Sequence, residues 1–96
     1  MDEASHASEG LPDLFTAREW RAIAAYLALT DQQRRIARWV CRGLSNKAIA
    51  DRLGVCQDTV RMHSRTLYKK LGIRSRMGVP VRAVLAARHL VETREL

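Results

Sequence analysis

The sequence predicts an all-α domain of five helices: a four-helix bundle containing a helix-turn-helix, preceded by one additional N-terminal helix. Apolar residues recur at spacings of three and four along most of the chain, which is the period of a helix with one buried face. Serine and threonine caps and single glycines divide this pattern into segments. No stretch alternates apolar and polar residues convincingly, so strands are not expected. The length of 96 residues indicates one domain with a modest core.

The first two helices each open on a capping box, in which a threonine hydroxyl accepts a free backbone N–H and the residue three positions on reaches back. The boxes are Thr16-Ala17-Arg18-Glu19 and Thr30-Asp31-Gln32-Gln33. Apolar stripes follow at Trp20, Ile23, Ala24 and Leu27 in the first helix and at Ile36, Trp39 and Val40 in the second. We therefore expect one helix over 16–29 and another from residue 30 to Gly43, where a left-handed cap ends it.

A short helix, a turn and a longer helix come next. Ser45 caps the short helix and Gly54 closes it, and the longer helix covers about 57–71 before Gly72. This is the outline of a helix-turn-helix, although other helical hairpins share it.

The last helix is expected to begin near Val79 or Pro80, because proline is welcome only in a first turn, and to reach about Val91. It has two apolar sides, Val81, Val84 and Leu85 on one and Ala83, Ala86 and Leu90 on the other. Such a helix needs two partners. We expect the first side to face the bundle and the small-residue side, Ala83, Ala86 and Leu90, to form a dimer interface. The alternative is that helix 16–29 covers the small-residue side.

The charge is strongly asymmetric. The chain has 17 Lys and Arg against 10 Asp and Glu, a net charge of +7. Four of the acidic residues lie in 1–15, which contains no Lys or Arg. We expect 1–15 to be an acidic leader, disordered or loosely attached over 1–13, and 16–96 to be the domain, with its core in 30–91. The leader is either a solvated tail or a competitor for the basic surface.

The helix over 57–71 has two chemically different faces. Val60, Ser64, Leu67 and Leu71 fall on one side, and Asp58, Arg61, Met62, Arg65, Tyr68 and Lys69 fall on the other. Arg61, Arg65 and Lys69 form a cationic row at i, i+4 and i+8, for which we expect no carboxylate partners. Phosphates would relieve the repulsion within such a row, and an arginine fork can bind guanine O6 and N7 together. Double-stranded DNA is therefore the expected partner.

Residues 29–76 resemble the LuxR-type (GerE-type) DNA-binding domain. The segments similar to its scaffold helix, its recognition helix and its exit are 44–55, Thr59-Val60-Arg61-Met62-His63 and Lys70-Leu71-Gly72-Ile73-Arg74-Ser75-Arg76. The resemblance implies a LuxR-like four-helix bundle that binds DNA as a dimer with its third helix in the major groove. It implies base contacts from Arg61, Met62 and Arg65. It implies phosphate contacts from Asn46, Lys47 and Thr59, with Lys69 and Lys70 further along.

The sequence departs from the family pattern at three positions. Gln33 replaces an acid, Ala48 replaces a glutamate and Cys56 replaces the Ser or Thr cap of the recognition helix. We expect the first two to remove polar support from the scaffold. Cys56 is either a poor cap or a redox-sensitive thiol at a helix N-terminus, and Cys41 is expected in the core.

Other classes of function lack their residues. The sequence shows no paired-carboxylate site, no nucleophile triad and no glycine-rich phosphate loop, so an enzyme is not expected. Its cysteines and histidines have no short metal-ligand spacing. No apolar run is long enough for a membrane helix, and no cofactor or small-molecule ligand is indicated.

The sequence therefore predicts a bacterial, cytoplasmic, nucleoid-associated transcription regulator that reads specific double-stranded DNA with helix 57–71 as a homodimer. It would consist almost only of its DNA-binding domain. Two alternatives share the helical outline: a protein-interaction adaptor and a sigma-factor-like promoter-binding module. The unbalanced cationic row argues against the adaptor, because protein interfaces are depleted of lysine.

Overall fold

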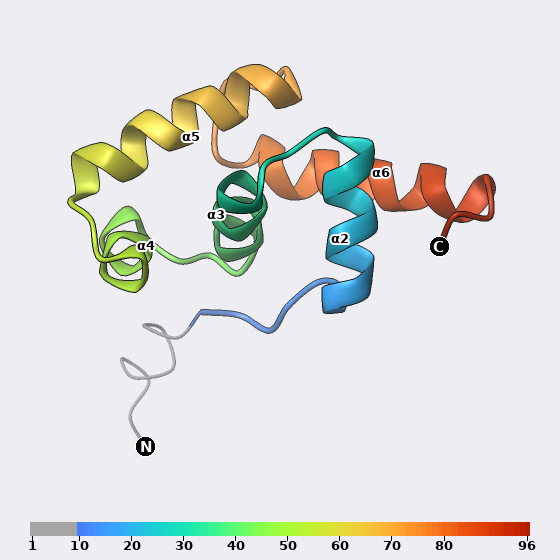
Figure 1. Ribbon diagram of the computed structural model, residues 1–96, viewed down its shortest axis with the longest axis horizontal. Helices are drawn as coiled ribbons and strands as arrows, with labels where there is room; N and C mark the ends of the chain where they lie inside the picture. Colours follow the sequence, from blue (N-terminus) through green and yellow to red (C-terminus); the bar gives the residue numbers. More distant parts are fainter. Residues whose placement is uncertain (1–9) are drawn as a thin grey trace.

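The computed structural model describes residues 10–96, and within them the chain forms helices and no strands (Figure 1). The helices are α2 (Ala17–Tyr26), α3 (Asp31–Cys41), α4 (Asn46–Leu53), α5 (Gln57–Leu71) and α6 (Gly78–Glu92). The predicted all-α class is therefore confirmed, as is the additional helix before the four-helix bundle. None of the described helices is long and apolar enough to span a membrane.

The predicted caps are present. The Thr16 hydroxyl accepts the Glu19 backbone N–H at 3.1 Å, and the Glu19 carboxylate accepts the Thr16 N–H at 2.8 Å. The box that opens α3 has the same pair of bonds, at 3.1 and 2.9 Å. Helix α2 ends at Tyr26, three residues earlier than expected, and Ala28 then turns with a φ of 58°. The short α2–α3 connection thus brings the second box into position.

Helix α3 runs through the middle of the bundle, with α4 and α5 on one side and α2 and α6 on the other (Figure 1). Its apolar stripe joins one core with side chains from every other helix. The largest fully buried side chains are Trp20, Ile23, Ile36, Leu44, Ile49, Val60, Leu67 and Val79. The core therefore fixes α5 against α3 through its apolar face and leaves its other face in solvent.

Helix α6 starts at Gly78, slightly earlier than predicted. A Cβ at this position would lie 2.7 Å from the Cβ of Ile73, so only glycine fits here without a shift of that neighbour. Pro80 accordingly falls in the first turn, where its missing N–H costs no helical bond.

The two apolar sides of α6 have the opposite roles from those predicted. Ala83, Ala86 and Leu90 are only 2%, 1% and 4% exposed, so the prediction of a dimer interface at these residues is wrong. Helix α2 covers this side: Leu90 borders Ala22 and Ala25, and Tyr26 stacks on His89 with ring centres 4.7 Å apart. Small residues here allow close approach of α2, not of a second copy. Val81, Val84 and Leu85, expected to face the core, are 58%, 49% and 48% exposed.

The described part of the leader is attached to the bundle. The Leu11 N–H donates to the Arg42 carbonyl and the Arg42 guanidinium donates to the Leu11 carbonyl, both at 2.7 Å. Asp13 accepts two hydrogen bonds from Arg38, both at 2.8 Å. The expectation of a loose leader is therefore wrong for 10–13, because long-range partners on α3 hold it. Residues 1–9, which carry the rest of that expectation, lie outside the described residues.

Candidate nucleic-acid interface

Helices α4 and α5 form the predicted helix-turn-helix. The Ser45 hydroxyl accepts the Ala48 N–H at 3.1 Å, which fixes the start of α4. Gly54 ends α4 with a φ of 69°, and the Val55 N–H then donates to the Ala50 carbonyl at 3.1 Å. Buried Ile49 and Val60 join the two helices. The turn therefore holds α5 at a fixed angle to α4, as reading DNA with one helix requires.

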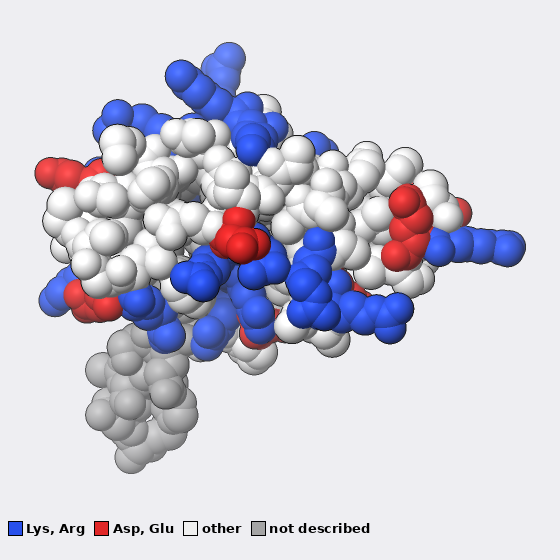
Figure 2. Space-filling model, in the orientation of Figure 1, with Lys and Arg blue, Asp and Glu red and all other residues white. Residues whose placement is uncertain are grey.

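The two faces of α5 are those predicted from the spacing, except at Tyr68. Val60, Ser64, Leu67 and Leu71 are buried, and Asp58, Arg61, Met62, Arg65 and Lys69 are exposed. Tyr68, expected on the exposed side, is half-buried and packs against the core. Figure 2 shows Lys and Arg side chains gathered over α5 and, separately, over the middle of the molecule. The outward face of α5 combines guanidinium forks with the apolar Met62 side chain, the groups that recognise base edges in a major groove.

One member of the cationic row has an acidic neighbour. The Arg61 guanidinium lies 2.6 Å from the Asp58 carboxylate, one turn earlier on α5, so the expectation of an entirely unpaired row is wrong. Both side chains are well exposed, and such pairs are weak in water. No carboxylate among residues 10–96 lies within ion-pair distance of Arg65 or Lys69. Arg65 is thus the guanidinium most available for a new partner.

The residues expected to contact phosphates lie in different surroundings. Lys47 is exposed in the first turn of α4. Asn46, beside it, is half-buried, and its side-chain oxygen accepts a hydrogen bond from Arg76 at 3.1 Å. Thr59 is half-buried in the first turn of α5. These three residues therefore lie at the N-terminal ends of the two helices, where free N–H groups favour anions.

Arg76 is a positioning residue that the sequence reasoning missed. Its guanidinium donates to the Asn46 side chain and to the Leu44 carbonyl, so it ties the segment after α5 to the segment before α4. The resemblance contained Arg76 in its exit motif, but a partner thirty residues away left no local signal. This tie sets the orientation of the Asn46 amide.

Lys70 does not extend the cationic row. Its ammonium group donates to the Ala28 carbonyl at 2.7 Å and to the Gln33 side-chain oxygen at 3.1 Å. These internal acceptors turn the group toward the α2–α3 connection, although Lys70 is exposed, and its contact with phosphate stays a prediction. Gln33 also completes the α3 capping box, so the expected loss of polar support at this position is wrong.

The two cysteines differ sharply. Cys41 is buried, and desolvation raises the pKa of its thiol to about 12. Cys56 is exposed at the N-cap of α5 and makes no side-chain cap hydrogen bond. Its sulfur lies 3.2 Å from the Thr59 hydroxyl, and that contact lowers the pKa of the thiol. The core position of Cys41 is confirmed, and Cys56 has the geometry of a poor cap.

Comparisons with known proteins agree with this geometry. The model of the family described as "Bacterial regulatory proteins, luxR family" matches residues 27–83, more than half of the chain. A nitrate/nitrite response regulator protein homolog of Haemophilus influenzae is 41% identical over 54 residues, which are 56% of this chain and 26% of that protein. The nitrate/nitrite response regulator protein NarL of Escherichia coli is 38% identical over 53 residues, 55% of this chain and 24% of that protein.

A putative HTH-type transcriptional regulator of Mycobacterium tuberculosis is 48% identical over 50 residues, 52% of this chain and 6% of that protein. The chain thus spans about a quarter or less of the length of these relatives. No solved structure matches it significantly. The family is one of regulatory proteins and not a class of enzymes. From its helix-turn-helix and this match, the chain belongs to the luxR family as a DNA-binding domain.

Proposed function

We propose that this protein is a transcription regulator that binds specific double-stranded DNA as a homodimer, with α5 in the major groove. The observation that carries the proposal is the outward face of α5, where Arg61, Met62 and Arg65 are exposed together on a helix fixed by the α4–α5 turn. Arg65 has its guanidinium free for guanine. Arg61 can exchange the exposed Asp58 for a base at little cost, because its present ion pair is solvated.

Phosphate contacts would position α5 on the duplex. Lys47, Asn46 and Thr59 lie at the starts of α4 and α5, and Lys69 continues the exposed row of α5. Contacts of this kind supply affinity and orientation without sequence information. Such a protein acts where the bacterial chromosome is, so we place it in the cytoplasm with the nucleoid.

A second copy would dock on the exposed apolar side of α6. Val81, Val84 and Leu85, with Pro80 and Leu14, line a shallow hollow of about 400 Å³ that contains no charged residue. A two-fold interface presents the same patch from each subunit, so an uncharged apolar patch is complementary to itself. We therefore place the dimer interface at these residues and not at the small-residue side of α6, which α2 covers.

Selection of bound sequences from a random DNA library tests the proposal as a whole. The expected consensus is a palindrome whose half-sites lie about one helical turn apart. A protein-interaction adaptor would select no consensus, and a sigma-factor-like module would select one without two-fold symmetry. The logarithm of the association constant K should fall linearly with the logarithm of the salt concentration, with a slope of about −0.9 for each phosphate neutralised. An absence of duplex binding at about 50 mM salt would refute the proposal.

Substitutions then distinguish residues that contact bases from residues that contact phosphates. Arg65→Ala should cost about 1–3 kcal/mol on the selected site and relax one base position. Lys47→Ala should weaken all sequences about equally and reduce the salt slope by about one. Arg88→Ala is the control, since this exposed arginine lies on α6 and pairs with Glu92. Equal, sequence-independent losses for Arg65→Ala and Lys47→Ala would mean that Arg65 contacts only phosphate.

The dimer has its own test. Val84→Glu should leave the chain folded but monomeric in sedimentation equilibrium, because it sets like charges together across the two-fold axis. On the palindrome it should bind half-sites independently and weakly. A Val84→Glu protein that remains dimeric would exclude this side of α6 as the interface.

A further inference from the structure

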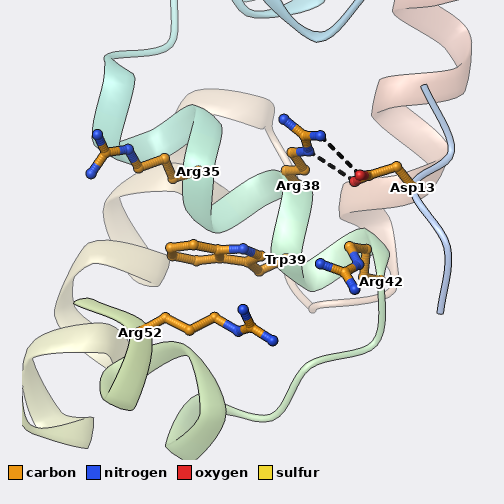
Figure 3. A pocket seen from close by; sticks show the side chains of 6 residues that line it. All are labelled: Asp13, Arg35, Arg38, Trp39, Arg42 and Arg52. Atoms are coloured by element: carbon orange, nitrogen blue, oxygen red, sulfur yellow. Dashed lines mark hydrogen bonds and ion pairs between the residues drawn. The ribbon is translucent and has the colours of Figure 1, made fainter. Parts of the chain in front are cut away.

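A second positively charged surface lies on α3, away from the helix-turn-helix face. Four arginines and one tryptophan line a hollow of about 390 Å³, closed on one side by Asp13 (Figure 3). Its lining is Arg35, Arg38 and Trp39 from α3, Arg42 directly after α3, Arg52 from α4, and Asp13 from the segment before α2. We call this feature the arginine hollow.

The arginine hollow is distinct from the surface proposed to bind DNA. Arg35, Arg38 and Arg42 are spaced by three and four residues, so they project from one face of α3. Ile36 and Val40, on the other face, are buried in the core that α3 shares with α5. The arginine face of α3 therefore points away from α5.

Asp13 shows how the arginine hollow binds an anion. The Arg38 Nε and a terminal guanidinium nitrogen donate to the two Asp13 carboxylate oxygens, both at 2.8 Å. This planar fork fits a phosphate as well as a carboxylate. The hydrogen bond from Arg38 holds the pKa of Asp13 below its usual value, so the carboxylate stays ionised near neutral pH. The chain itself thus supplies a stand-in for the anionic group of a ligand.

One carboxylate does not neutralise the arginine hollow. Arg42 lies beside Asp13 in the hollow and donates its Nε to the Leu11 carbonyl. The Arg52 guanidinium lies 6.0 Å from the centre of the Trp39 ring, a cation–π contact that keeps its charge beside the hollow. Within residues 10–96, no carboxylate lies in ion-pair range of Arg35 or Arg52. An occupant with several negative charges therefore fits better than Asp13 alone.

We propose that the arginine hollow is a binding site for a small polyphosphate, either inorganic or carried by a nucleoside. Its volume is that of a small-molecule site. Guanidinium groups from two helices can contact separate phosphates, whereas a single carboxylate satisfies one fork. The half-buried indole of Trp39 adds a flat apolar surface, which a nucleoside base would use and inorganic phosphate would not.

Titration of the full chain with tripolyphosphate and with adenosine triphosphate tests this site, by calorimetry and by tryptophan fluorescence. Trp20 is fully buried, so a change in emission would come from Trp39 and be lost in Trp39→Phe. We expect binding of one ligand per chain. Arg38→Gln and Arg52→Gln should each weaken it at least about tenfold, the effect of one lost hydrogen bond to a charged group. Asp13→Asn should strengthen it severalfold, because the built-in competitor is weakened.

Matched variants decide between this site and others. Arg88→Gln removes the same charge from the exposed side of α6 and should leave binding nearly unchanged. Equal losses for Arg88→Gln and Arg38→Gln would overturn the proposal in favour of general attraction to a basic protein. A loss confined to Arg65→Gln would place the ligand on α5 instead. Circular dichroism of each variant confirms that it is folded.

A comparison of the two ligands shows which form of polyphosphate the site prefers. Tighter binding of adenosine triphosphate than of tripolyphosphate, with the difference removed by Trp39→Ala, would identify the nucleoside form. Equal binding would identify the phosphate groups alone. The proposal would be refuted if neither ligand bound at about 50 mM salt. It would also be refuted if the protein bound a synthetic acidic peptide but neither polyphosphate. Because the variants of Asp13, Arg38, Trp39 and Arg52 leave the α5 face intact, failure here leaves the DNA-binding proposal standing.

Discussion

Two positions on α6, two residues apart, should respond in opposite ways to the same substitution. Ala86 is 1% exposed and Val84 is 49% exposed. Ala86→Glu places a carboxylate inside a cluster of apolar side chains from α2, α3 and α6. Val84→Glu places it in solvent. The two variants therefore test, in a single comparison, which side of α6 faces the bundle.

The expected size of the effect follows from burial. A buried glutamate either ionises at high cost or stays protonated with its pKa raised by about 3 units, which corresponds to about 4 kcal/mol at neutral pH. Overpacking at a filled alanine site adds about 1–3 kcal/mol. A domain of this length has a total stability of roughly 5–14 kcal/mol, so Ala86→Glu removes a large part of it or all of it. Val84→Glu should change stability by less than about 0.5 kcal/mol.

Urea unfolding followed by far-ultraviolet circular dichroism measures both variants, at a protein concentration low enough for the monomer to dominate. Val84→Glu should keep the native midpoint within about 0.5 M, and Ala86→Glu should be unfolded or lose several molar. The penalty at Ala86→Glu should shrink as the pH falls toward about 4. A glutamate whose folded pKa is raised costs stability only where the unfolded chain is ionised. A folded Ala86→Glu protein beside an unfolded Val84→Glu protein would refute the assignment of the two sides.

Three further perturbations test local features. Cys56→Ser should raise the thermal midpoint by about 2–6 °C, because serine supplies the missing cap hydrogen bond of α5; an unchanged midpoint would contradict this reading. A thiol-reactive disulfide reagent should modify Cys56 in the native protein and Cys41 only on unfolding. The Cys56 thiol is exposed with a lowered pKa, whereas the Cys41 thiol is buried with its pKa raised to about 12. Equal rates of modification would show that Cys41 is accessible in the native protein. Asp13→Asn should lower stability at neutral pH, and its deficit should vanish as the pH falls through the depressed pKa of Asp13, below 3.8; a deficit that persists at lower pH would mean that the ion pair is not its cause.

Local signals in the sequence predicted most of the fold. The capping boxes at Thr16 and Thr30 and the glycine caps at Gly54 and Gly72 need only neighbouring residues. Helices α2 and α3 begin at these boxes, and α4 and α5 end at these glycines. The two faces of α5 were predictable for the same reason. One side of that helix is apolar and the other charged, so only one orientation buries the core.

The orientation of α6 could not be predicted in this way. Both of its sides are apolar, so its period permits either to face the bundle. The outcome depends on where α2 and α3 lie, which is a property of the tertiary fold: both helices pack against α6, and the small Ala83 and Ala86 are buried. The larger Val84 would have kept both helices further from α6.

Side-chain partners distant in the sequence were equally hidden. Lys70 is bound to Gln33 and to the Ala28 carbonyl, and Arg76 to Asn46, across thirty or more residues. Charge and spacing alone make each of these cations a candidate for phosphate. Only the fold shows which are held by internal acceptors and which, like Lys69, remain in solvent.

The described part of the acidic leader lies near one of the two basic surfaces and not the other. Its described carboxylate, Asp13, is held by Arg38 on α3, and α3 lies between that carboxylate and the core that it shares with α5. A helix is about 10–12 Å across, and the Debye length is about 10 Å at 0.1 M salt, so Asp13 screens the α5 row only weakly. The described carboxylate of the leader, Asp13, therefore lies at the arginine hollow and not at α5. A polyphosphate that displaced Asp13 would release segment 10–13 from Arg38, while Arg61 and Arg65 on α5 kept their exposure.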